Sequence, residues 1–197
     1  MNKTKRAIFE SAIKVFSNSG YNGATMDIIA ADAGVAKGTL YYHFKSKEEI
    51  FNFIIKEGMQ VIKERIESIA VKQEDILSKI KVVCRVQLGF VYESRDFFKV
   101  VMSQLWGQES RQLELRESIK RYINYIQSYL EEAMEQGVVK KGDSYLMAYT
   151  LFGTICSAAV YELINYELIN EDKKNIDELM DSLLKYILSG IQEKSNN

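Results

Sequence analysis

The sequence of 197 residues contains no proline, two cysteines and one histidine. Because proline breaks the interior of a helix, its absence from a chain of this length predicts an all-α fold rather than a sandwich or a loop-rich fold. Cys84 and Cys156 each lie in an apolar helical pattern, which favours free thiols and a cytoplasmic protein. His43 has no neighbouring Asp or Cys that could share a metal ion, so we expect no metal and no cofactor.

The distribution of apolar and charged residues predicts neither a signal peptide nor a membrane span. The start MNKTKRAIF is basic but has no continuous apolar core before Glu10, so no signal peptide is predicted. The stretch 144–161 carries no charge over 18 residues, the lower limit for a membrane span. It contains serines and threonines, and Asp143 and Glu162 bracket it, so we expect a helix buried between neighbours and no membrane partner.

The net charge of −1 conceals an uneven distribution. Residues 1–47 hold seven Lys or Arg and three Asp or Glu, a net charge of +4, whereas the remainder holds 19 and 24, a net charge of −5. A basic amino-terminal part joined to an acidic remainder is typical of a polyanion-binding domain carried by a sensing or assembly domain.

Residues 25–49, TMDIIAADAGVAKGTLYYHFKSKEE, predict two short helices joined by a glycine turn. Thr25 can cap a helix over residues 26–33, and Gly34 can take the left-handed conformation that ends it. A second helix follows over residues 37–44, and Ser46 with Glu49 forms a capping box for the next one. Two helices that cross so tightly need small or apolar contacts, for which we expect Ala30, Val35, Leu40 and Phe44.

The second of these helices has a polar side that its packing does not use. Lysine can donate to guanine, and threonine or tyrosine can meet base edges or a thymine methyl, while Gly38 permits close approach of the backbone. Tyr41 and Tyr42 could instead be ordinary helix surface. We predict that this side reads DNA through Lys37, Thr39, Tyr41 and His43.

Apolar residues at helical spacing predict about nine helices in all. The remaining ones are expected at residues 3–19, from 46 onward, 74–93, 95–106, 108–136, 144–168 and 172–191.

Gly20, Thr25 and the run IAADAGVAKGTLYYHFKSKEEI resemble the TetR family of bacterial transcriptional regulators. The resemblance implies three amino-terminal helices that bind an operator (residues 1–47) and a helical effector-binding and dimerisation domain (residues 48–197). It also implies that Thr25, Tyr42 and Lys47 contact phosphates, as helix amino termini commonly do. We therefore expect a homodimer, formed through the last two helices, that represses transcription until a small apolar effector releases it from double-stranded DNA.

No ligand motif of the family can be transferred to residues 48–197. This part of the chain is rich in tyrosine, phenylalanine and methionine, which can line an apolar cavity with a few hydroxyl donors. Residues in the middle of this part of the chain, on separate predicted helices, are the preferred candidates for effector contacts, namely Met102, Trp106, Tyr125, Tyr149 and Phe152.

Three alternatives remain open at this point. A transcriptional activator of the same fold has the same sequence signals as a repressor. A helical protein-interaction module without DNA binding is distinguished by duplex binding that lacks salt dependence. An enzyme is disfavoured, because the chain has no nucleophile elbow, phosphate loop, zinc spacing or second histidine.

Overall fold

The computed structural model describes residues 1–169, 178, 181–186 and 189. All regular structure in these residues is helical, which confirms the predicted all-α class. Residues 178, 181–186 and 189 are helical as well, whereas the rest of the predicted helix 172–191 lies outside the described residues. Within residues 1–169 the helices are α1 (Lys3–Gly23), α2 (Met26–Asp32), α3 (Lys37–His43), α4 (Lys47–Ala70), α5 (Ile76–Glu93), α6 (Arg95–Ser103), α7 (Ser110–Glu135) and α8 (Ser144–Ile169).

The chain forms two compact units. Unit 1 comprises residues 1–61 and 94–119, and unit 2 comprises residues 62–93 and 120–197. The division falls inside α4 and α7, so each of these helices contributes residues to both units. The basic segment 1–47 lies entirely within unit 1.

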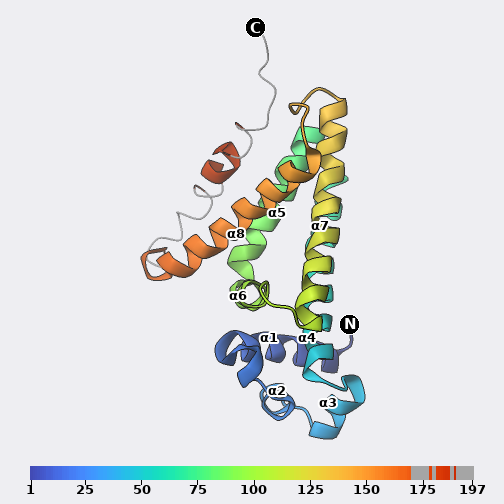
Figure 1. Ribbon diagram of the computed structural model, residues 1–197, viewed down its shortest axis with the longest axis vertical. Helices are drawn as coiled ribbons and strands as arrows, with labels where there is room; N and C mark the ends of the chain where they lie inside the picture. The colour runs from blue at the N-terminus through green and yellow to red at the C-terminus, as the bar shows by residue number, and fades with distance from the viewer. Residues whose placement is uncertain (170–177, 179–180, 187–188, 190–197) are drawn as a thin grey trace. The chain divides into compact units, whose positions relative to one another are not determined.

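In unit 1, α1 packs against both α2 and α6 (Figure 1). The helical run of α1 is interrupted at Gly20, whose φ of 68° is left-handed, so the expected break at this glycine is present although Gly23 closes the helix. The Ser17 hydroxyl donates to Asp96 Oδ1 on α6 at 2.6 Å. Phe16 stacks on Tyr21, and Phe51 of α4 meets both rings edge-on. These contacts hold α1 against α6 and the start of α4.

The helix-turn-helix is built by the local signals read from the sequence. Thr25 Oγ1 accepts the Ile28 N–H at 3.2 Å, and Gly34 ends α2 with a φ of 64°. Ser46 Oγ accepts the Glu49 N–H, but the Glu49 carboxylate takes the Lys45 N–H rather than that of Ser46, a variant of the expected capping box. The ends of α2, α3 and α4 differ from prediction by one residue.

The expected contacts between α2 and α3 are present, and Leu40 is fully buried. Ala30 and Phe44 are also buried, and Val35 is half-buried. Two helix ends differ from prediction by more than two residues: α1 continues past its break at Gly20 to Gly23 instead of ending at 19, and α6 ends at Ser103 instead of 106. The Gln104 N–H bonds to Val101 in a tighter turn, and Gly107 then adopts a positive φ of 115° that a helix cannot contain.

In unit 2, α5 packs against α8 and is tied to α7 by polar contacts (Figure 1). The buried side of α5 is formed by Ile76, Ile80, Val83, Cys84, Val86, Gln87, Leu88, Phe90 and Val91. Among the described residues, no helix combines the length and hydropathy that a membrane span requires.

Candidate nucleic-acid interface and ligand-binding residues

The predicted reading side of α3 is accessible. Lys37, Gly38, Tyr41 and Tyr42 are exposed, and Thr39 and His43 are half-buried. Tyr42 is 77% exposed and is the most accessible aromatic side chain of the helix. The ring of Tyr42 meets that of His43 edge-on at 5.1 Å, which orients the histidine. One short helix therefore presents a lysine, a threonine and two phenols on a side that no neighbouring helix covers.

Lys37 is held in place by a neighbour on α2. Its ammonium lies 2.7 Å from Asp27 Oδ1, and this hydrogen bond raises the pKa of Lys37 above its ordinary value. The same ammonium lies 6.0 Å from the centre of the Tyr41 ring. Because the Lys37 ammonium is paired with the Asp27 carboxylate, it must weaken or break this ion pair to donate a hydrogen bond to a base.

Thr25 and Lys47 stand at the amino termini of α2 and α4, as expected. Lys47 Nζ donates to the backbone carbonyls of Tyr21 at 2.8 Å and Ala24 at 3.1 Å. An ammonium has three donors, so one N–H remains after these two bonds. Lys47 thus joins the end of α1 to the start of α4, a structural contact that the sequence did not indicate.

Two cations that come from distant parts of unit 1 contact the ring of Tyr21. Lys47 Nζ is 4.4 Å from the centre of the ring, and the guanidinium of Arg111, on the first turn of α7, is 3.8 Å from it. The Arg111 side chain is only 6% exposed and pairs with Glu109, whose pKa this hydrogen bond lowers. Sequence reasoning missed this cluster, because 90 positions separate its aromatic and guanidinium members.

The five candidate effector residues fall in both units. Met102 is half-buried on α6, and Trp106, in the turn after that helix, is 81% exposed. Tyr125 on α7 and Tyr149 and Phe152 on α8 belong to unit 2. Their roles in effector binding stay predictions.

Tyr125 lines a cavity of about 700 Å³ at the surface of unit 2. Its hydroxyl lies 3.0 Å from that of Tyr129, and burial raises its pKa. Lys63 Nζ lies 5.3 Å from the centre of the Tyr125 ring. The other described residues that line this cavity are Glu67, Ser68, Ala70, Val71, Lys79, Ser128, Tyr129 and Glu132.

A buried polar pair joins α5 to α7 in the core of unit 2. Gln87 Nε2 donates to the Tyr122 hydroxyl, and both side chains are buried. Burial raises the pKa of Tyr122, and it raises the pKa of the nearby Cys84 thiol to about 12. Gln87 Oε1 has no hydrogen-bond partner among the described residues. The apolar periodicity of α5 gave no sign of this pair, because a single glutamine does not alter a helical pattern.

The described residues contain no group of three His, Cys, Asp or Glu side chains that could hold a metal ion.

Comparisons with known proteins give a consistent result over both units. A family model described as bacterial regulatory proteins, tetR family, matches residues 8–54. The Fatty acid metabolism regulator protein of Bacillus subtilis (strain 168) is 32% identical over 192 residues, which cover 95% of each chain.

Two solved structures extend this similarity. A Clostridium perfringens protein described as a candidate fatty acid metabolism regulator is 46% identical, with a TM-score of 0.84 over 95% of this chain and 100% of that one. The transcriptional regulator FadR from Bacillus subtilis, in complex with stearoyl-CoA, is 27% identical, with a TM-score of 0.82 over 95% of this chain and 99% of that one.

Proposed function

Because the chain belongs to the TetR family of bacterial transcriptional regulators, and so is a ligand-responsive DNA-binding regulator, we propose that its effector is a long-chain fatty acyl-CoA. In this proposal the protein is a homodimer that represses genes of fatty acid metabolism. Binding of the acyl-CoA releases it from its operator.

One observation carries the choice of effector. The family model covers only residues 8–54, so it supports DNA binding and says nothing of a ligand. The similarity to the Bacillus subtilis fatty acid metabolism regulator spans 95% of both chains and therefore includes all of α5 to α8. Related sequences over a whole ligand-binding domain support a related ligand class.

For DNA recognition, we propose that α3 enters the major groove and that the helix amino termini contact the backbone. Thr39, Tyr41 and Lys37 meet base edges, because they lie on the accessible side of α3. Thr25, Tyr42 and the third N–H of Lys47 contact phosphates, which position the protein without reading sequence. The exposure of Tyr42 and the helix-terminal positions of Thr25 and Lys47 support this division.

We propose that α8 and the helix after it form the dimer interface. Several large apolar side chains on α8 are exposed in the single chain, which supports a partner on this helix: Leu146, Tyr149, Val160, Tyr161 and Ile164. In a dimer, two copies of α3 must reach successive major grooves about 34 Å apart. A ligand that changes their separation therefore weakens operator binding.

Tyr21 supplies a physical route for that coupling within unit 1. Arg111 stands on the first turn of α7, and Lys47 on the first turn of α4. Both contact the same ring, so a small shift at the start of α7 is passed to the residues that hold the DNA-binding helices. A buried, stacked guanidinium transmits such a shift better than a solvated charge, because its packing leaves little freedom.

The test combines operator selection with ligand titration. Genomic fragments from the source organism are selected with the purified protein, and binding to the selected duplex is measured with and without stearoyl-CoA. A coupling free energy of ~1–3 kcal/mol predicts a 5- to 150-fold loss of operator affinity. Free CoA, which lacks the apolar chain, is the control and should cause no comparable loss. If stearoyl-CoA binds the protein but leaves operator affinity unchanged, the proposed release mechanism is wrong.

A further inference from the structure

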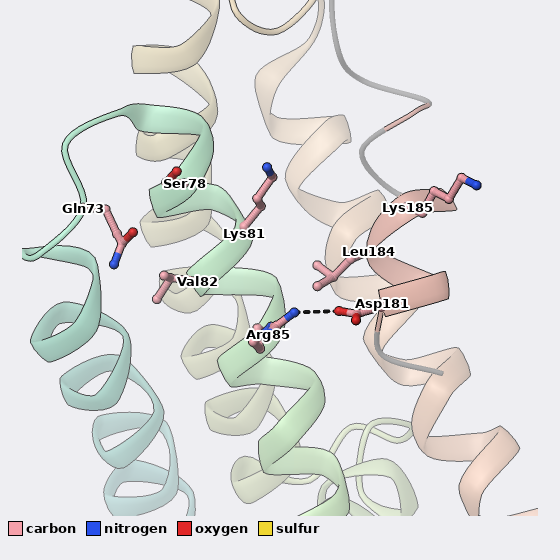
Figure 2. A pocket seen from close by; sticks show the side chains of 8 residues that line it. All are labelled: Gln73, Ser78, Lys81, Val82, Arg85, Asp181, Leu184 and Lys185. Atoms are coloured by element: carbon pink, nitrogen blue, oxygen red, sulfur yellow. Dashed lines mark hydrogen bonds and ion pairs between the residues drawn. The ribbon is translucent and has the colours of Figure 1, made fainter. Parts of the chain in front are cut away.

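A cleft of about 500 Å³ opens in unit 2 between α5 and the helical residues 181–186 (Figure 2). Its volume falls within the usual range for small-molecule sites. Eight residues line it: Gln73, Ser78, Lys81, Val82, Arg85, Asp181, Leu184 and Lys185.

The cleft is cationic in a part of the chain that is acidic overall. Among the described residues that line it, three are positive and only Asp181 is negative, a net charge of +2. By contrast, residues 48–197 together carry a net charge of −5. Lys81 lies on α5 and Lys185 on the facing residues 181–186, and both are exposed, with the Lys185 ammonium pointing outward from the cleft (Figure 2). Among the residues that the structure describes, neither lysine pairs with a carboxylate within 4.0 Å. The described residues therefore concentrate positive charge at the cleft and leave most of it without a paired carboxylate.

Arg85 is the third cation, and an exposed ion pair with Asp181 holds its guanidinium at the cleft. Its Nη2 lies 2.6 Å from Asp181 Oδ1, with the two side chains 61% and 68% exposed. An ion pair this exposed contributes little to stability, so an incoming anion can compete with Asp181 for the guanidinium. The planar guanidinium is well matched to phosphate oxygens.

The lining of the cleft also includes two apolar side chains, those of Val82 and Leu184. Leu184 is buried and its side chain points toward α5, between Lys81 and Arg85, whereas the half-buried Val82 lies on the side of α5 that faces away from residues 181–186 (Figure 2). A lining of cationic and aliphatic side chains suits a ligand that joins phosphate groups to an uncharged ring or chain. An inorganic anion alone would not contact the aliphatic side chains.

We propose that this cleft binds the phosphate-bearing nucleotide end of a CoA thioester, with Lys81, Arg85 and Lys185 contacting the phosphates. This assignment rests on the proposed function, because it supposes an acyl-CoA effector. It adds that the effector is recognised through its phosphates as well as its acyl chain. It also predicts that Asp181 opposes binding, since it competes for Arg85 and repels an anion.

The experiment compares two thioesters that share the acyl chain and the pantetheine and differ in the phosphate-bearing nucleotide. Binding of stearoyl-CoA and of S-stearoyl-pantetheine, which lacks the nucleotide, is measured by calorimetry on the full chain below their micelle concentrations. The variant is Lys81→Gln/Lys185→Gln. The matched control is Lys140→Gln/Lys141→Gln, which removes two exposed lysines from the loop before α8 that do not line the cleft.

The cleft variant should bind stearoyl-CoA roughly tenfold more weakly, from about two- to fivefold for each exposed charge contact. Its affinity for S-stearoyl-pantetheine should be unchanged, as should both affinities of the control. Asp181→Asn should act in the opposite direction and raise stearoyl-CoA affinity about two- to fivefold. Circular dichroism establishes that the variants are equally folded.

The outcomes separate this inference from the proposed function. If the unsubstituted protein binds no stearoyl-CoA, both fail. If it binds stearoyl-CoA and the cleft variant matches the control, the assignment of the cleft alone is wrong. If inorganic phosphate displaces stearoyl-CoA at equal ionic strength, the cleft is a site for free phosphate and the nucleotide assignment is also wrong.

Discussion

The helices α3 in unit 1 and α5 in unit 2 differ in how much of their surface is buried. Only Leu40 of α3 is buried, and the remaining side chains are accessible or half-buried. In contrast, half of the 18 residues of α5 are buried, including the polar Gln87. The comparison teaches that a short helix can be specified by its exposed side, whereas the chemistry of a long core helix depends on neighbours from elsewhere in the chain.

The largest expected contrast between the two helices is in salt dependence. If the α3 surface neutralises roughly 6–10 phosphates per dimer, operator affinity should fall 10³- to 10⁵-fold between 50 and 200 mM salt. Stearoyl-CoA affinity should fall less than about tenfold over the same range, because burial of an apolar chain is not screened. Fluorescence anisotropy and calorimetry measure the two responses. A flat response of DNA binding would favour the alternative of a protein-interaction module.

A second contrast separates the two sides of α3 itself. Leu40→Ala should lower the free energy of unfolding by about 2–5 kcal/mol, because it empties a fully buried site. Tyr42→Ala should change that free energy by less than ~0.5 kcal/mol and weaken binding to all duplexes alike. Denaturant melts and binding isotherms on both variants check this. A Tyr42 variant that loses stability but keeps DNA affinity would contradict the proposed surface.

A variant of Arg111 tests whether the contacts of Tyr21 with Lys47 and Arg111 couple effector binding to DNA binding. Arg111→Gln should reduce the effect of stearoyl-CoA on operator affinity toward onefold, a loss of up to ~1–3 kcal/mol of coupling. Affinities for each ligand alone should be retained, because Arg111 is proposed to contact neither. Arg121→Gln, on the unit 2 part of the same helix, is a matched control. Normal release in the Arg111 variant would show that Tyr21 is only a packing contact.

The polar pair in the core of unit 2 can be tested with a double-mutant cycle. Gln87→Leu and Tyr122→Phe should each lower the free energy of unfolding by ~1–3 kcal/mol, because each leaves a buried polar group without its partner. The double variant should lose less than the sum of the two, since no orphaned group remains. Additive losses in urea melts would mean that the hydrogen bond is not formed in solution.

The smallest expected effect concerns pH. Arg65 donates two hydrogen bonds to Glu93, at 2.5 and 3.1 Å, and lowers the pKa of that carboxyl below its ordinary 4.5. The pair therefore contributes fully above about pH 4.5 and is lost as pH falls through the lowered pKa. Because both side chains are about half exposed, the contribution should be below ~1 kcal/mol. The difference in unfolding free energy between the unsubstituted protein and Arg65→Gln should shrink in acid, and a constant difference would contradict this.

Much of unit 1 could be predicted because its signals are local. Thr25 caps a helix three residues away, Gly34 ends one, and Ser46 begins another. Each of these contacts spans at most five residues, so residue type alone specifies it. The end of α6 was missed, since side chains of the following helix stabilise the turn: Arg111 donates to Gln104 Oε1 and Arg116 donates to the Gly107 carbonyl.

The sequence alone determined the helical class, the boundaries of the DNA-binding motif and the accessible side of α3, because helix capping and periodicity act over a single turn of helix. Only the tertiary structure decided that Lys47 is anchored on two carbonyls, that Arg111 stacks on Tyr21 and that Arg85 meets Asp181, 96 positions away. Such contacts arise when packing of apolar surfaces brings distant segments together. No local pattern encodes which charged side chains will then lie at the contact.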